Sequence, residues 1–199
     1  AFFQKRLKAI LDAKQISLKK DCLEIWNLRG HASDYISLIP KMIEHSKSRN
    51  YSLIIIDPIY KLYGELNENS AGEVAKLLNS IDSLCIETGA AVAFGAHYSK
   101  GNQASKESID RISGSGVFAR DPDSILSFTK HEQDGAFTVD CTLRNHASIE
   151  PFVVEWEFPL FKVGDLNPEN LKQAKGGRSK SFNESQILDL LGSKSLKLS

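Results

Sequence analysis

The stretch Tyr51-Ser-Leu-Ile-Ile-Ile-Asp-Pro58 is an apolar run that ends abruptly in an acid. Four apolar residues in succession, three of them β-branched, are typical of a strand buried on both faces of a parallel sheet. An acid that follows such a strand lies at the carboxyl edge of the sheet, where α/β proteins bind their ligands. We therefore expect Asp57 to lie at a ligand-binding edge.

Helical and strand-like patterns alternate around this stretch. The spacing of apolar residues predicts helices, the second capped by Asp34 and the third ended by Gly89, over residues 1–14, 34–48 and 71–88. Apolar runs and alternation predict strands over residues 22–28, 51–56, 90–96, 124–129, 137–143 and 152–158. This order predicts the α/β fold class, with a mostly parallel sheet flanked by helices and antiparallel C-terminal strands.

Composition limits the class of protein. The 199 residues are 41% hydrophobic, which is enough for one main core domain, predicted over residues 1–163. A Gly, Lys and Ser-rich linker is predicted over 164–180. Residues 181–199 are predicted to be either a docked tail or the start of a truncated C-terminal segment that resembles a winged helix. The 25 basic and 25 acidic residues cancel, so any nucleic-acid binding must come from a local patch.

The predicted location is cytoplasmic. No apolar stretch approaches the roughly 18 residues that a membrane-crossing helix needs, and the amino-terminal residues lack the apolar centre of a signal peptide. The cysteines Cys22, Cys85 and Cys141 are far apart and set in apolar surroundings, which is typical of reduced thiols in a core. We expect a soluble protein without a membrane partner.

Two polar residues follow strands that we expect to be neighbours. Asp57 is a candidate metal residue, because nucleotide hydrolases place at this point an acid that holds Mg²⁺ or a water of its shell. His97 ends the strand over 90–96, where a polar side chain can contact the γ-phosphate of a nucleotide. The alternatives are an acid that aids solubility or caps a turn, and a histidine that makes structural hydrogen bonds.

A polar stretch over residues 98–112 is too long for an ordinary connection. It carries Lys100, Asn102, Gln103 and Lys106, with Arg111 near its end, as candidate nucleic-acid-binding residues. Basic side chains neutralise backbone phosphates and amides add hydrogen bonds to them. The alternative is a set of solvated loop charges.

Arg144 follows the predicted strand over 137–143. It is either a surface charge or an arginine finger, a residue that reaches the γ-phosphate bound by a neighbouring subunit. Trp26 and Trp156 have strand spacing and are predicted to lie in the core. A metal-dependent hydrolase using Asp57, His97 and His146 is a further possibility, but the sequence lacks a close ligand pair such as H-x-x-x-H.

The motif that usually accompanies such an acid is missing. A phosphate-binding loop has the pattern G-x-x-x-x-G-K-[ST], and no stretch of the 199 residues fits it. Gly192-Ser-Lys-Ser has only the last letters, without the first glycine or a preceding strand. The sequence thus has the metal-binding end of an ATPase core without its phosphate-binding end.

Taken in order, these segments resemble a known family. Leu53-Ile-Ile-Ile-Asp57-Pro, Asn67-Glu-Asn-Ser-Ala-Gly72, Phe94-Gly-Ala-His97-Tyr-Ser-Lys100-Gly, Gly114-Ser-Gly116 and Leu143-Arg-Asn145 resemble the RecA-like AAA ATPases of the plasmid RepA type. These proteins are relatives of the DnaB hexameric helicases. The resemblance covers about residues 1–158 and implies a RecA-like P-loop NTPase core.

The resemblance also implies roles, cofactors and partners. ATP and Mg²⁺ would be the cofactors, with Asp57 as the Walker B acid, His97 as the sensor and Arg144 as the finger of the adjacent subunit. Lys100 to Arg111 would form the channel loop for single-stranded DNA. The partner would be a second copy in a homo-oligomer, a hexamer by family habit. Thr142 stands where the family often has a lysine, a departure that concerns stimulation by partners.

The predicted function is therefore an ATP-dependent, ring-forming, helicase-like motor or replication ATPase associated with DNA. The resemblance further implies that Ala1 is not the natural start and that strands with the phosphate-binding loop and a catalytic glutamate precede it. The alternative is a degenerate RecA-like module that binds DNA or protein partners without hydrolysis.

From the missing loop we predict that residues 1–199 alone neither bind ATP tightly nor hydrolyse it, because nothing in them cradles the phosphates. The measurement is phosphate release by the purified 199-residue chain, with its mass verified. A clear rate above a buffer control would contradict the prediction.

Overall fold

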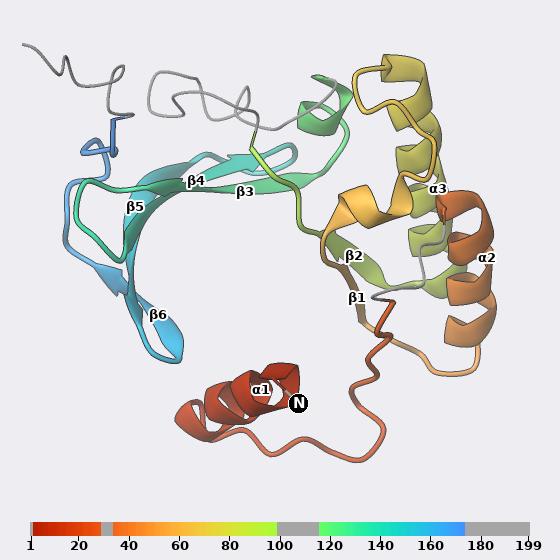
Figure 1. The fold of residues 1–199 in the computed structure, drawn as a ribbon, viewed down its shortest axis with the longest axis horizontal. Coiled ribbons are helices and arrows are strands. Elements are labelled where there is room, and N and C mark those ends of the chain that lie inside the picture. The colour runs from red at the N-terminus through yellow and green to blue at the C-terminus, as the bar shows by residue number, and fades with distance from the viewer. Residues whose placement is uncertain (1, 29–33, 99–115, 174–199) are drawn as a thin grey trace, which may run out of the picture.

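The computed structural model describes residues 2–28, 34–98 and 116–173 (Figure 1). In chain order its α-helices, 3₁₀ helices (η) and strands are α1 (Phe2–Ala13), α2 (Tyr35–Ser46), β1 (Leu53–Ile56), η1 (Ile59–Leu62), α3 (Ala71–Thr88), β2 (Ala91–Phe94), η4 (Gly116–Ala119), β3 (Ser124–Lys130), β4 (Ala136–Leu143), β5 (Ile149–Glu157) and β6 (Leu160–Gly164). The mixed α/β class is confirmed.

The parallel pairing of β1 with β2 organises one half of the molecule. Leu53 pairs with Ala91 and Ile56 with Phe94, and α2 and α3 lie together on one side of this pair (Figure 1). The core there comes from α2, β1, η1, α3 and η4. Its least exposed members, at 2% or below, are Ile59, Val74, Leu77, Leu78, Leu84 and Phe118.

The start of α2 and the end of α3 lie where the sequence predicts, although α2 ends at Ser46 rather than near residue 48. The Asp34 carboxylate accepts a hydrogen bond from the Ser37 N–H at 2.9 Å, the arrangement of a helix N-cap, and α2 follows with Pro40 inside it. The α3 helix ends at Gly89, whose φ of 69° lies in the left-handed region that glycine adopts without strain.

The other half is a four-stranded antiparallel sheet in the order β3-β4-β5-β6. Parallel pairing is thus the smaller part of the described residues, and the prediction of one mostly parallel sheet is corrected. β6 was not predicted; it pairs with β5 from Val153–Gly164 to Glu157–Leu160 as the return strand of a tight hairpin. Such hairpins need only a short connection, unlike parallel pairs.

The two faces of this sheet differ. On one face Ser127, Thr129 and Thr138 are buried, and the Thr138 hydroxyl donates to the Pro168 carbonyl at 3.0 Å in a segment that follows β6. The other face carries exposed apolar side chains in mutual contact, with the Trp156 and Phe161 ring centroids 4.8 Å apart. The segment after β6 therefore covers part of the polar face, whereas Trp156 and Phe161 on the apolar face are 42% and 47% exposed.

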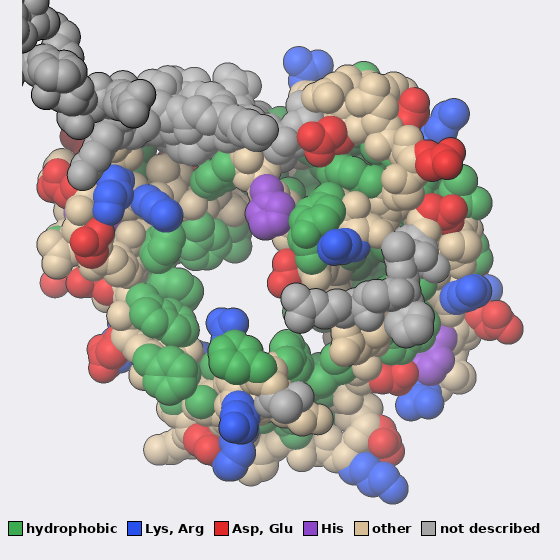
Figure 2. Space-filling model, viewed as in Figure 1, with side chains coloured by type: hydrophobic (Ala, Val, Ile, Leu, Met, Phe, Trp, Pro, Cys, Tyr) green, Lys and Arg blue, Asp and Glu red, His purple; other side chains and the backbone are tan. Residues whose placement is uncertain are grey.

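Exposed apolar side chains also line the hollow in the centre of the molecule (Figure 2). β1 was predicted to be buried on both faces, but Leu53 and Ile55 are 52% and 68% exposed because α2 and α3 cover only one side of it. Trp26 and Trp156, predicted in the core, are 39% and 42% exposed. Full burial of a Leu or Ile side chain contributes roughly 1.5–3 kcal/mol, so these partly exposed side chains forgo a share of that stabilisation.

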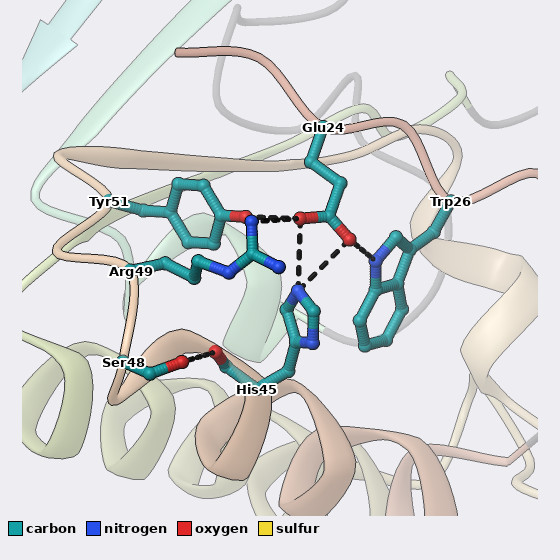
Figure 3. A network of polar contacts seen from close by, with 6 residues as sticks. All are labelled: Glu24, Trp26, His45, Ser48, Arg49 and Tyr51. Carbon is teal, nitrogen blue, oxygen red and sulfur yellow. Dashed lines mark hydrogen bonds and ion pairs between the residues drawn. The ribbon is translucent and has the colours of Figure 1, made fainter. Parts of the chain in front are cut away.

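Residues 22–28 form no strand, contrary to prediction, and every one of them is exposed. A strand requires a backbone ladder with a neighbour, and this segment is instead held by side-chain contacts, chiefly those of Glu24 (Figure 3). The Glu24 carboxylate accepts hydrogen bonds from the Tyr51 hydroxyl at 2.5 Å and the Trp26 indole at 2.9 Å. It also pairs with His45 at 2.9 Å.

Two further predictions concern the burial of the cysteines and the absence of a membrane-crossing helix. All three cysteines are free; Cys22 is exposed, against prediction, whereas Cys85 and Cys141 are partly buried. Burial raises the pKa of the Cys85 thiol, so it stays protonated at neutral pH. Among the residues that the structure describes, no helix has both the length and the apolar character needed to cross a membrane.

The Glu24 contacts predict a pH effect. Hydrogen bonds from Tyr51, His45 and Trp26 lower the pKa of Glu24 from 4.5 to about 2. A depressed carboxyl pKa stabilises the fold above its unfolded value, and this stabilisation is lost as the pH falls from 4.5 toward 2. Glu24→Gln should therefore lower the urea midpoint at pH 6 and lose that difference near pH 2.

The measurement is Trp26 fluorescence during urea unfolding in a Trp156→Phe background. Glu44→Gln on the exposed side of α2 is the control and should shift the midpoint little at any pH. A Glu24→Gln difference that stays constant from pH 6 to pH 2 would contradict the assignment.

Candidate nucleotide site

Asp57 and His97 lie at the same edge of the β1–β2 pair. Because the strands are parallel and in register, the residues after Ile56 and Phe94 leave the sheet at one end. The Ile59 N–H donates to the Gly95 carbonyl and the Gly95 N–H donates to the Ile56 carbonyl, both at 2.9 Å. These bonds fix the two strand ends to each other, and both Asp57 and His97 are exposed there.

Gly95 makes room for the Asp57 carboxylate. A Cβ atom added at Gly95 would lie 2.8 Å from Asp57 Oδ1, closer than real contacts allow. The carboxylate therefore rests against the backbone of the neighbouring strand end. Sequence reasoning missed Gly95, although a glycine directly after a strand that pairs with an acid-ended strand is the signal for such a close approach.

A small pocket of about 90 Å³ lies beside His97. Its wall includes Tyr60, whose ring centroid is 5.5 Å from that of His97, and Tyr63. Burial, with a smaller effect of Glu68, raises the pKa of Tyr63 to about 12. Its hydroxyl therefore stays protonated at neutral pH and can donate a hydrogen bond to a ligand. Neither tyrosine was predicted.

The donor set at this edge fits Mg²⁺ carried by a nucleotide. Mg²⁺ is commonly bound through one or two carboxylates, phosphate oxygens and waters. Asp57 supplies an exposed carboxylate, and Gly95 leaves space for it. Within residues 2–28, 34–98 and 116–173 there is no group of three or more His, Cys, Asp or Glu arranged to hold a metal by itself, so the metal-dependent hydrolase with Asp57, His97 and His146 gains no support.

Arg144 lies in the other half, directly after β4. Its backbone N–H donates to the Asp123 carbonyl at 2.9 Å. Its guanidinium donates through Nη2 to the Arg120 carbonyl, and Nη1 lies 3.8 Å from Asp123 Oδ1. With 47% of its side chain exposed, Arg144 lies on the surface rather than in the pocket beside His97.

The predicted nucleic-acid-binding residues Lys100, Asn102, Gln103, Lys106 and Arg111 all lie outside the described residues. Their part in binding stays a prediction. Tyr98, just before them, is described; its hydroxyl is 3.5 Å from the Thr129 hydroxyl of β3.

A larger pocket than the one beside His97 lies elsewhere in the described part. It is a groove of about 480 Å³ between α2 and α3, with Ile39 and Pro40 among its lining residues. The Lys47–Glu87 ion pair, 3.0 Å long, lies among its lining residues too. It contains none of the predicted site residues, so size alone does not locate the site.

Comparison with known proteins identifies the family. Residues 3–103 match the AAA domain family. The chain belongs to this family. The match spans α1 to β2 and includes both Asp57 and His97. AAA domains indicate an ATPase-type function and generally bind nucleotide with Mg²⁺. No curated protein matches the chain.

The AAA chemistry and the Gly95 contact together give a test. In the full-length protein, Gly95→Ala should weaken Mg²⁺-dependent ATP binding roughly tenfold, the size of effect seen when the surroundings of a metal ligand change. The fold should survive, because the atom that must move is the flexible end of Asp57.

The measurement is titration with a fluorescent ATP analogue, with and without Mg²⁺. Gly72→Ala is the matched control, since no atom lies within 4 Å of the added Cβ and alanine favours a helix. Equal Mg²⁺-dependent affinity for Gly95→Ala and the unaltered protein would overturn the role of this contact.

Proposed function

We propose that this AAA family member is an ATP-dependent, ring-forming ATPase of the plasmid RepA type, with a RecA-like core that acts on DNA. The observation that supports it most is the edge where β1 and β2 end together. Asp57 and His97 follow the two strands at this edge. Because Gly95 has no Cβ, there is room beside it for the Asp57 carboxylate. A carboxylate and a polar sensor at neighbouring strand ends suit a Mg²⁺-bound triphosphate.

In the proposed reaction a water oxygen attacks the γ-phosphorus of ATP. The bond from that phosphorus to the oxygen bridging to the β-phosphate breaks, and its electron pair leaves with ADP, while the water protons pass to phosphate and solvent. Mg²⁺, when bound, neutralises charge on the phosphate oxygens. Asp57 orients the metal or a water of its shell, and His97 contacts the γ-phosphate and marks its loss.

Arg144 serves a neighbouring copy in this proposal. Its half-exposed guanidinium lies on the surface, on a different sheet from Asp57. A surface arginine suits a charge that is supplied in trans to the triphosphate of the next subunit. The partner is thus a second copy of this chain, in a homo-oligomer of which the hexamer is the expected form.

Single-stranded DNA is the proposed substrate of the motor. The candidate contacts are Lys100, Asn102, Gln103, Lys106 and Arg111, which follow His97 in the sequence. Binding through them would neutralise a few phosphates and weaken as salt rises. Their position after the sensor strand would let nucleotide state act on DNA contact.

The proposal requires a phosphate-binding loop, which residues 1–199 do not contain as a motif. Other residues of the protein would have to supply it. The same observation favours a second candidate, a degenerate RecA-like module that binds partners or DNA without hydrolysis. The gene sequence upstream of Ala1 separates the two, since only the first requires a glycine-rich loop ending in Gly-Lys-Ser/Thr.

The test of hydrolysis in trans is Arg144→Ala in the full-length protein. We expect kcat for ATP to fall roughly 10³-fold, because an arginine finger stabilises charge in the transition state. The affinity for ATP should change little, since the ground state is held by other groups. Phosphate release gives kcat, and binding of a fluorescent analogue gives affinity.

The matched control is Arg49→Ala, an arginine that pairs with Glu24 at 3.6 Å. Its kcat should stay near that of the unaltered protein. Normal ATP turnover by Arg144→Ala would contradict the proposed role of Arg144.

A further inference from the structure

Asp123 stands opposite Arg144 at the open end of the β3–β4 ladder. Ser124, the first residue of β3, pairs with Leu143, the last residue of β4. The residues just beyond this pair are therefore brought together by the register. The Arg144 N–H donates to the Asp123 carbonyl at 2.9 Å, which extends the ladder by one bond.

The Arg144 side chain follows the same segment. Nη2 donates to the Arg120 carbonyl and Nη1 lies 3.8 Å from Asp123 Oδ1. An arginine guanidinium is a planar fork of N–H donors without an acceptor. These contacts engage part of the fork and restrict its rotation, while 47% of the side chain remains open to solvent.

The Arg120 carbonyl, which accepts the hydrogen bond from the Arg144 side chain, lies in a turn that is fixed by backbone hydrogen bonds. The Arg120 and Asp121 N–H groups donate to the Val117 carbonyl, each at 3.0 Å, which closes a turn after η4. Phe118 of η4 is 2% exposed and packs against Phe94, with ring centroids 6.3 Å apart. The segment that holds Arg144 is thus anchored in the core.

We propose that Asp123 is a positioning residue, which holds the guanidinium of Arg144 in the orientation needed to meet the γ-phosphate of a neighbouring copy. This inference rests on the proposed function of Arg144. Held in one plane, the guanidinium loses less rotational freedom when it meets a triphosphate. The same side chain on its own would sample many rotamers.

Asp123 orients Arg144 without trapping it. The Asp123 side chain is 80% exposed, so water screens its attraction for the guanidinium. A triphosphate, which carries more negative charge and several acceptor oxygens, competes successfully for the remaining donors. The backbone carbonyl of Arg120 is neutral and adds direction rather than charge. Asp123 therefore acts on turnover rather than on ATP affinity.

The experiment uses steady-state ATP hydrolysis by the full-length protein. Asp123→Asn should lower kcat about threefold and Asp123→Lys about tenfold or more, because the lysine repels Arg144. The KM for ATP should stay within about twofold for both. Asp121→Asn, two residues earlier in the same segment, is the matched control and should retain kcat.

A double-mutant cycle separates positioning from loss of stability. In an Arg144→Ala background, Asp123→Asn should have no further effect on kcat, since the side chain that it orients is gone. An equal loss in both backgrounds would overturn the inference, as would unchanged or raised kcat in the Asp123 single variants. Normal turnover by Arg144→Ala alone would instead show that the proposed function of Arg144 fails.

Discussion

The parallel pairing of β1 with β2 is the constraint on which the candidate site depends. Its register brings the residues after Ile56 and Phe94 to one edge, and the two Gly95 backbone bonds prevent the ends from separating. The pairing is stabilised from one side by the apolar faces of α2 and α3. Long-range pairing of this kind must overcome the entropy of closing the intervening chain, so the buried face of α3 is essential to it.

The molecule buries its apolar surface unevenly. α3 is fully sequestered along one face, with Val74, Leu77 and Leu84 at 0% exposure, whereas Leu53 and Ile55 on the opposite face of β1 are largely open. The aromatic face of the β3–β6 sheet is open as well. The open surfaces border one hollow (Figure 2). Apolar surface of this extent is uncommon on a solitary soluble domain and is typical of surfaces that another polypeptide segment covers.

The electrostatics divide between the two halves. At the β1–β2 edge an exposed carboxylate and a histidine leave the sheet together, which suits a metal-bound anion. Around Arg144 the neighbouring side chains are acidic, among them Asp123 and Asp82 of α3. Burial, with smaller effects of Asp121 and Asp123, raises the pKa of Asp82, and the charge of Arg144 lowers it. Arg144 is thus a half-exposed basic side chain with acidic neighbours, and its guanidinium donates to the Arg120 carbonyl.

Local signals were sufficient for the elements that carry their own pattern. Asp34 marks the start of α2, Gly89 marks the end of α3, and the alternating run ending at Leu143 forms β4, because capping, a left-handed residue and period-two alternation act over a few residues. The sequence also placed Asp57 and His97 at strand ends. The resemblance to AAA ATPases, carried by the same short motifs, agrees with the family match over residues 3–103.

The tertiary structure decided the strand pairing and the side-chain contacts that follow from it. Residues 22–28 have the composition of a strand but no ladder partner, so they stay irregular and are held by Glu24. The approach of Gly95 to Asp57, and that of Asp123 to Arg144, arise from strand register. The sequence by itself determined the helices, most of the strands and the chemistry at their ends; pairing and one-sided burial determined which of those groups meet, because contacts between distant residues leave no periodic trace in the sequence.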